Sequence, residues 1–246
     1  MSRNEATQQI KNISKDKQYT ILKNYFQISP TFIENIYKES DGKKTIIFQK
    51  EDERNDEKRS QVIGDLGILE FKSIKDELVT LMKITNDFKD PVGAYLLSEA
   101  GGKEQDPHTD YELLNNFPSY YKYSYIAFVA IMDKTNMVAY NDDGTKFIIS
   151  LDIGDVLIAR QDFIHAGPSY DDENARLHFY FDQMVTCSRE DDKTYYTAFD
   201  NIAASSEGSY YFASRSTNAF NTHAILRKRK ERNNRSAANA RRGWNL

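Results

Sequence analysis

The stretch from Gly154 to Asp182, GDVLIARQDFIHAGPSYDDENARLHFYFD, decides the fold. It is typical of a strand, a turn that carries His165, a polar loop and a second strand that begins at Arg176. A strand alternates its side chains between two faces, so the second strand separates polar from apolar residues. Its polar face carries Arg176, His178, Tyr180 and Asp182. Such a face on a mostly apolar strand indicates a cavity that holds an anion.

A second motif, Pro107-His108-Thr109-Asp110-Tyr111, lies about fifty-five residues upstream. If this motif is extended, His108 and Asp110 point to the same side of the chain. Together with His165 they form a set of two imidazoles and one carboxylate, which suits ferrous iron and leaves coordination positions open. Arg176 follows His165 by eleven residues. Its guanidinium is a permanently charged, forked donor that is well suited to a carboxylate.

These residues, with the Gly154-Asp155 pair that opens the preceding strand, resemble the iron(II)- and 2-oxoglutarate-dependent dioxygenases over residues 92–184. The resemblance implies a double-stranded β-helix, or jelly roll. It implies that His108, Asp110 and His165 bind Fe(II) and that Arg176 pairs with the distal carboxylate of 2-oxoglutarate. Dioxygen is the further co-substrate, and ascorbate is an additional candidate cofactor. Many members have a hydroxyl residue two places after the Arg, where this chain has His178.

Three further residues are candidates for contacting the co-substrate. His178 follows Arg176 on its polar face, Tyr95 lies on the strand before the proximal motif, and Tyr125 lies in the most apolar strand, Tyr123–Asp133. Each has an alternative interpretation as a buried side chain of the core.

Composition indicates a soluble protein with one folded domain and appendages. The chain has 246 residues, of which 39% are hydrophobic and 13% aromatic. Its single cysteine, Cys187, excludes a disulfide within the chain and fits a reducing compartment. The N-terminus lacks the apolar core of a signal peptide, and the longest apolar run is too short to span a bilayer. We therefore expect an intracellular protein, cytoplasmic or nuclear, with no membrane partner.

The expected architecture is mainly β with N-terminal α elements, a jelly-roll core and flanking helices on one outer face. Residues 1–18 are polar and predict a mobile N-terminus. Residues 19–186 form the jelly-roll domain, whose helices are expected from a Ser29-Pro30 start to Glu39 and from a Ser73 cap to Phe88. The mixed charges of residues 51–60 favour a solvated loop. Residues 187–246 are predicted to be an irregular extension with a basic C-terminal tail.

The basic tail contrasts with an acidic body. The last twenty residues carry a net charge of +7, so the remainder of the chain is near −11. The segment Arg227–Arg242 is typical of a nuclear localisation patch or a nucleic-acid contact. It also resembles the basic region of leucine-zipper factors, but no zipper follows it. We therefore expect weak nucleic-acid contact, mainly through phosphates.

The function that these patterns predict is hydroxylation of an unidentified substrate, a protein side chain or a small molecule, with release of succinate and CO2. Two alternatives stay open. One is a cupin-like metal-binding protein that does not use 2-oxoglutarate. The other is a nonenzymatic binding module whose working part is the basic tail.

Overall fold

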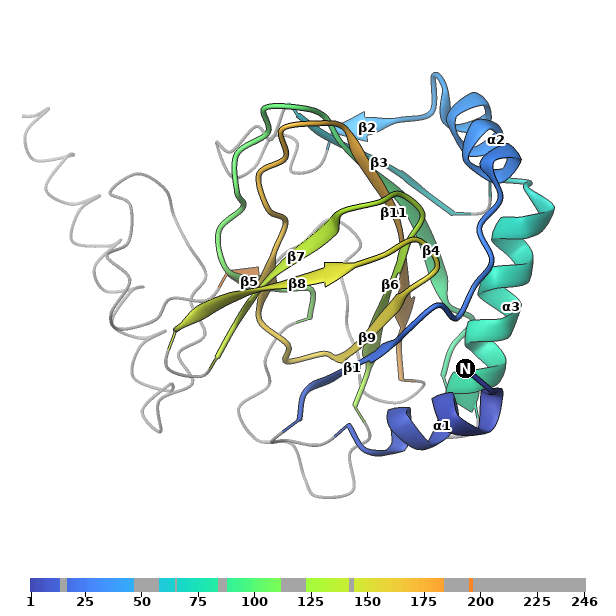
Figure 1. The fold of residues 1–246 in the computed structure, drawn as a ribbon, viewed down its shortest axis with the longest axis vertical. Helices are drawn as coiled ribbons and strands as arrows, with labels where there is room; N and C mark the ends of the chain where they lie inside the picture. Colours follow the sequence, from blue (N-terminus) through green and yellow to red (C-terminus); the bar gives the residue numbers. More distant parts are fainter. Residues whose placement is uncertain are drawn as a thin grey trace, which may run out of the picture.

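Two antiparallel β-sheets face each other in the computed structural model, and three helices cover the outer face of the larger sheet (Figure 1). The structure describes residues 1–13, 17–46, 58–64, 66–83, 88–111, 123–141, 144–183 and 195–196.

The larger sheet has seven strands in the order β1-β9-β6-β11-β4-β3-β2. Their bounds are β1 Tyr19–Leu22, β2 Thr45–Ile46, β3 Arg59–Ile63, β4 Val92–Ser98, β6 Tyr125–Ala130, β9 Val156–Arg160 and β11 Asn174–Phe181. The strand β11 lies at the centre, between β6 and β4. The smaller sheet has the order β12-β5-β10-β7-β8. Its bounds are β5 His108–Thr109, β7 Thr135–Tyr140, β8 Lys146–Leu151, β10 His165–Ala166 and β12 Tyr195–Tyr196.

The predicted alternation of β11 is confirmed. Leu177, Phe179 and Phe181 are buried in the cluster beneath the helices. On the opposite face, Tyr180 packs against the cluster between the two sheets, and His178 stacks on Phe128 of that cluster. The central strand therefore separates an apolar, helix-covered layer from an inter-sheet layer that also holds polar side chains.

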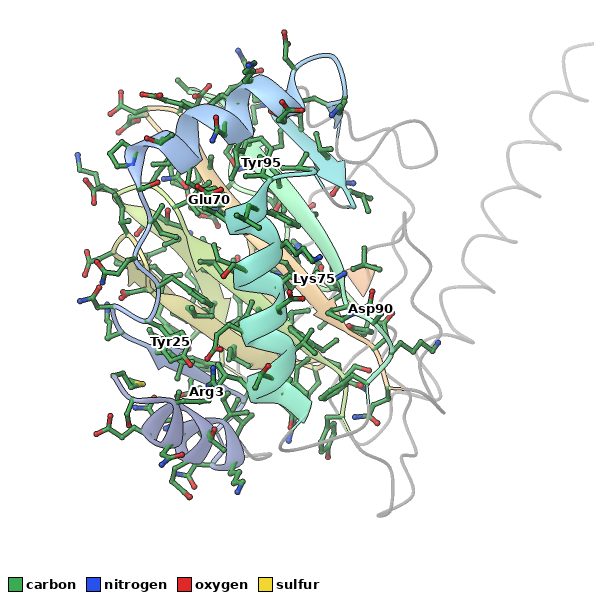
Figure 2. The ribbon with its side chains drawn as sticks, turned by 90° about the vertical axis from the view of Figure 1, so that its right-hand side faces the viewer. Arg3, Tyr25, Glu70, Lys75, Asp90 and Tyr95 are labelled. Carbon is green, nitrogen blue, oxygen red and sulfur yellow. The ribbon has the colours of Figure 1, made fainter. Side chains whose placement is uncertain are left out.

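The helices are α1 Arg3–Lys11, α2 Pro30–Ser40 and α3 Leu69–Lys83. Figure 2 shows α3 lying across the sheet, with α1 and α2 towards its two ends. The helices bury apolar side chains against the sheet, among them Phe71 of α3, whose ring lies 5.4 Å from that of Phe179. A facing pair of antiparallel sheets with helices on one outer side is the jelly roll expected from the sequence.

The predicted start of α2 is correct, because Ser29 accepts a hydrogen bond from the Phe32 N–H and Pro30 opens the helix. The predicted start of α3 at Ser73 is wrong. The helix begins at Leu69, and Phe71 in its first turn is buried against the sheet. Packing of this earlier turn, which no local cap signals, sets where the helix begins.

Residues 1–18 also differ from the expected mobile segment, because they contain α1. Ser2 and Glu5 form a capping box at its start, and Ala6 and Ile10 are buried. The sequence carried this signal, a Ser followed three residues later by Glu. The helix is held by burial of one small apolar face on the rest of the protein.

Two further expectations are corrected, because residues expected outside the sheets belong to strands. Arg59 and Ser60, placed in a solvated loop by their charged surroundings, belong to β3, and Arg59 is 2% exposed. Within the extension 187–246, Tyr195–Tyr196 forms β12 and pairs with β5. The rest of this extension, including the basic tail, lies outside the described residues.

Candidate metal and anion site

Two very short strands of the smaller sheet carry the histidines of the candidate site. His108 opens β5 and His165 opens β10, and the two residues are direct antiparallel partners. Their rings lie 4.6 Å apart between centroids. The pairing of β5 with β10 thus joins two motifs that are separated by more than fifty residues.

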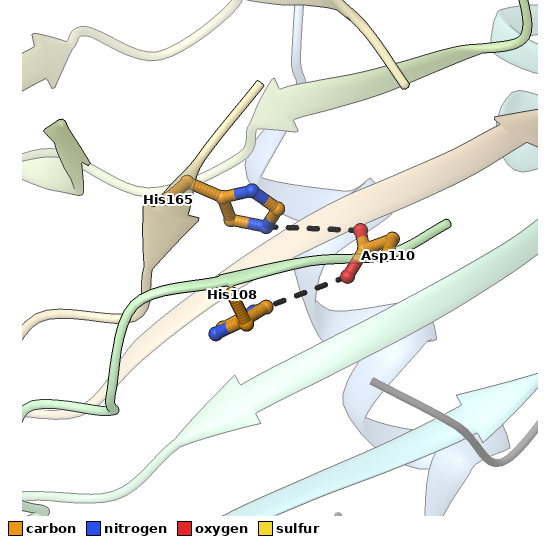
Figure 3. A group of neighbouring side chains, drawn as sticks. All are labelled: His108, Asp110 and His165. Atoms are coloured by element: carbon orange, nitrogen blue, oxygen red, sulfur yellow. Dashed lines mark ion pairs between the residues drawn. The ribbon is translucent and has the colours of Figure 1, made fainter. Parts of the chain in front are cut away.

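Asp110 completes the group, because it follows His108 by two residues and faces both rings (Figure 3). Its Oδ1 lies 3.9 Å from His108 Nε2, and its Oδ2 lies 3.7 Å from His165 Nε2. One ligand atom from each residue lies within 4.8 Å of the other two. The sequence-predicted set of His108, Asp110 and His165 therefore converges in a single place.

Backbone carbonyls orient both imidazoles. His108 Nδ1 lies 2.8 Å from the Asp106 carbonyl oxygen, and His165 Nδ1 lies 3.2 Å from that of Phe163. A carbonyl only accepts hydrogen bonds, so each Nδ1 carries the proton. Each Nε2 then presents its lone pair towards Asp110, which is the usual arrangement of metal-binding histidines.

Burial keeps these imidazoles neutral. Loss of solvent, together with the neighbouring His165, lowers the pKa of His108 to about 4. Burial likewise lowers the pKa of His165 to about 4. Both rings are therefore uncharged at neutral pH, and a neutral imidazole is the form that binds a metal.

Arg176 lies on the same face of β11 as His178 and is 4% exposed. Its Nη1 donates a long hydrogen bond of 3.5 Å to Ser98 Oγ, and within the described part of the chain it forms no ion pair. Burial lowers the pKa of the guanidinium, yet an Arg remains charged at physiological pH. A buried charge with no acidic partner is costly, so this position is prepared for an anion.

His178 lies beside the metal-binding group and not within it. Its Nε2 is 3.3 Å from Asp110 Oδ2. The ring is held between those of Phe128 and Tyr180, each 4.1 Å away between centroids. The structure thus brings His178 to the site, in contact with the candidate ligand Asp110.

The structure does not bring Tyr95 or Tyr125 to the site. Tyr95 pairs in register with Leu177, whereas Arg176 pairs with Leu96, so Tyr95 faces the helices. Its ring lies 6.2 Å from that of Tyr37 in α2. Tyr125 also belongs to the helix-side cluster. Successive residues of a strand face opposite sides, so both tyrosines point away from the face that carries Arg176 and His178.

Arg59 is the residue near the site that the sequence did not reveal. Its Nη2 donates hydrogen bonds of 2.6 Å to the Lys103 and Pro168 carbonyl oxygens. These two carbonyls belong to the loops that precede His108 and follow His165. No motif marks Arg59, which stands at the end of a run of charged residues.

Comparison with known proteins supports the fold. No family model and no curated protein matches the sequence. Among solved structures, a prolyl hydroxylase from Trichoplax adhaerens, in complex with a hypoxia-inducible-factor peptide, matches with a TM-score of 0.58 at 12% identity, covering 73% of this chain and 90% of its own. A Pseudomonas putida prolyl-4-hydroxylase matches with a TM-score of 0.55 at 10% identity, covering 72% and 98%.

A third similar structure is the epimerase SnoN, solved with Fe3+, alpha-ketoglutarate and nogalamycin RO. Its TM-score is 0.51 at 15% identity, and the match covers 73% of this chain and 83% of the epimerase. At such identities the matches establish a shared jelly-roll fold.

Proposed function

We propose that this chain is an Fe(II)- and 2-oxoglutarate-dependent oxygenase that hydroxylates a substrate still to be identified. The observation that carries the proposal is the meeting of His108, Asp110 and His165 on a jelly roll that also buries Arg176, which has no acidic partner among the described residues. Two of the three structural neighbours described above are prolyl hydroxylases, and the third, the epimerase SnoN, was solved with Fe3+ and alpha-ketoglutarate.

The donor set fits ferrous iron. Two imidazole nitrogens and one carboxylate are the ligands that non-haem Fe(II) oxygenases use, and they leave positions open for other molecules. All three side chains are at most 11% exposed, so little solvent competes for them. His178 lies outside the group of mutually close ligand atoms, which argues against a cupin-like fourth histidine ligand.

Arg176 fits the distal carboxylate of 2-oxoglutarate. A buried guanidinium forms a strong, two-pronged contact with a carboxylate. Ser98, whose hydroxyl lies 3.5 Å from Arg176 Nη1, is a second donor at the same place. Tyr95 and Tyr125 are excluded from this role by their position on the helix side. His178 contacts the Asp110 carboxylate. We propose that it affects the co-substrate indirectly, through this contact with a metal ligand.

Bound iron, with 2-oxoglutarate and dioxygen, supplies the oxidising chemistry, and the products are succinate, CO2 and a hydroxylated substrate. The residues of the chain position the metal ligands and shield the site from water. Phe163 stacks parallel to His165 at 5.7 Å, and Phe128 packs on both His165 and His178. These aromatic rings keep the imidazoles fixed and exclude water from one side of the metal site.

The test is release of succinate from 2-oxoglutarate by purified protein with Fe(II) and ascorbate, even without the substrate. Asp110→Ala is expected to abolish it while the protein remains folded. Tyr95→Phe is the matched control and should leave it unchanged. Metal binding without any effect of 2-oxoglutarate would favour the cupin-like alternative, and the absence of metal binding would favour a nonenzymatic module.

The basic segment Arg227–Arg242 supports a separate, weaker proposal, that of nonspecific nucleic-acid contact. It rests on charge alone, because this segment lies outside the described residues. We expect the full chain to bind duplex DNA in a salt-dependent way, and a chain that ends at residue 226 to lose this binding.

No helix within the described ranges is both long and apolar enough to cross a membrane.

A further inference from the structure

Arg59 connects the larger sheet to the candidate metal site. It opens β3, which lies between β4 and the edge strand β2. Although its neighbours in sequence are charged and polar, Arg59 is 2% exposed and is among the largest fully buried side chains. Such deep burial of an Arg indicates that its donors satisfy specific acceptors.

Those acceptors lie on two loops. The Nη2 of Arg59 donates to the Lys103 carbonyl and to the Pro168 carbonyl, each at 2.6 Å, with a longer contact of 3.5 Å to the Gly167 carbonyl. Lys103 lies five residues before His108, and Pro168 lies three residues after His165. One guanidinium nitrogen therefore joins the chain that enters β5 to the chain that leaves β10.

A second set of bonds links the same loops. The Gln105 N–H donates to the Gly167 carbonyl at 2.9 Å, and the Gly167 N–H donates to Gln105 Oε1 at 2.9 Å. A Cβ at Gly167 would lie 2.5 Å from Gln105 Oε1 and 3.2 Å from Arg59 Nε. The loops approach so closely that a Cβ at this position would displace the Gln105 side chain from its present place.

The direct pairing between the two histidine strands is short. Both β5 and β10 have two residues, and His165–His108 is the one register pair that joins them. So short a ladder offers few backbone hydrogen bonds to fix the relative position of the two imidazoles. On their other sides β10 pairs with β7 and β5 pairs with β12, and the loops held by Arg59 add a direct constraint between the two histidine segments.

We propose that Arg59 is a positioning residue for the metal site, which sets the separation of His108 and His165 by clamping the loops next to them. This inference rests on the proposed function, because it concerns the same three ligands. Outer groups that orient metal ligands commonly change metal affinity by about 10- to 100-fold when they are removed. A guanidinium suits this task because it directs several fixed N–H donors from a single buried group.

The experiment measures Mn2+ affinity by calorimetric titration of the full chain without 2-oxoglutarate or dioxygen chemistry. The variants are Arg59→Met, which removes every donor, and Arg59→Lys, which keeps a charge and fewer donors. Asp155→Asn is the matched control. Asp155 is also a buried charge that ties loops, through Lys23 Nζ at 2.6 Å and the Asn24 N–H at 2.7 Å, but it bonds to neither histidine loop.

Arg59→Met is expected to weaken Mn2+ binding about 10- to 100-fold, with a smaller loss in Arg59→Lys. Hydrogen exchange should increase in residues 103–109 and 165–170 of both variants. Asp155→Asn is expected to lower the melting temperature and leave the Mn2+ affinity unchanged. If Arg59→Met does not fold, Arg59→Lys decides the matter.

The outcomes separate the two proposals. Wild-type protein that binds Mn2+, with folded Arg59 variants that bind it equally well, overturns the role of Arg59 alone. A loss of affinity that Asp155→Asn reproduces in full also overturns it, because general destabilisation would then account for the effect. Wild-type protein that binds no Mn2+, or binds it equally well after Asp110→Ala, removes the metal site and this inference together.

Discussion

Replacing Arg176 with Met is expected to make the ligand-free protein more stable while it destroys 2-oxoglutarate binding. Arg176 is 4% exposed, and the hydrogen bond that its guanidinium donates to Ser98 Oγ is 3.5 Å long. Transferring a charge from water to such a place costs several kcal/mol, and the described residues offer no ion pair to offset it. Met has a similar length and no charge.

The expected gain in the free energy of unfolding is about 1–4 kcal/mol, by analogy with the range seen when buried ion pairs are replaced by apolar residues. For a chain of 246 residues this corresponds to roughly 2–4 °C of melting temperature per kcal/mol. In the wild-type protein loaded with Mn2+, 2-oxoglutarate at about one hundred times its Kd should add about 2.7 kcal/mol. In Arg176→Met this addition should vanish.

The assay is thermal unfolding in chelator, in Mn2+, and in Mn2+ with 2-oxoglutarate. Arg160→Met is the matched control. Arg160 is likewise buried, at 2% exposure, but it has an acidic partner, because its Nε donates to Asp162 Oδ1 at 2.7 Å. Removing this partner should destabilise the protein, opposite in sign to Arg176→Met. If Arg176→Met destabilises the ligand-free protein as Arg160→Met does, and 2-oxoglutarate still stabilises it, the reasoning about a prepared anion site is refuted.

Three other predictions follow from the same geometry. Tyr95→Phe should leave the affinity for 2-oxoglutarate unchanged in a calorimetric titration, because this ring faces the helices; a large loss would restore it to the site. The metal-free protein should lose stability as pH falls from about 6.5 towards 4. Burial lowers the pKa of His108 and of His165 to about 4 in the folded protein, so in that pH window only the unfolded chain takes up protons. Unfolding curves at pH 7 and 5 test this, and the difference should shrink in His108→Asn. Gly154→Ala should cost at least about 1 kcal/mol in denaturant unfolding, because Gly154 has φ 86° and an added Cβ would lie 2.0 Å from the Phe26 carbonyl oxygen; an unchanged midpoint would contradict this.

The parts of the fold that could be predicted from the sequence are those with a local, repeating signal. Alternation along residues 176–182 gave both faces of β11, and the spacing of His108 and Asp110 placed them on one side of the chain. The start of α2 was readable because Ser29 and Pro30 have local roles. Each of these features depends on neighbours in the sequence.

The parts that could not be predicted depend on contacts between distant segments. The face of Tyr95 is set by its register with Leu177, eighty residues away, and no local pattern fixes that register. The role of Arg59 depends on carbonyls of two remote loops, so its charged neighbours made it look like a surface residue. The start of α3 follows from packing of Phe71 on Phe179, which is likewise a tertiary contact.

The central claim is that one small site binds a metal through His108, Asp110 and His165 and an acid through Arg176. The most direct measurement is an oxygen-free calorimetric titration of 2-oxoglutarate into the full chain, with and without Mn2+. The account predicts one Mn2+ per chain and 2-oxoglutarate binding that is strong with the metal and weak without it. Binding of 2-oxoglutarate that is indifferent to Mn2+, or absent under both conditions, would contradict it.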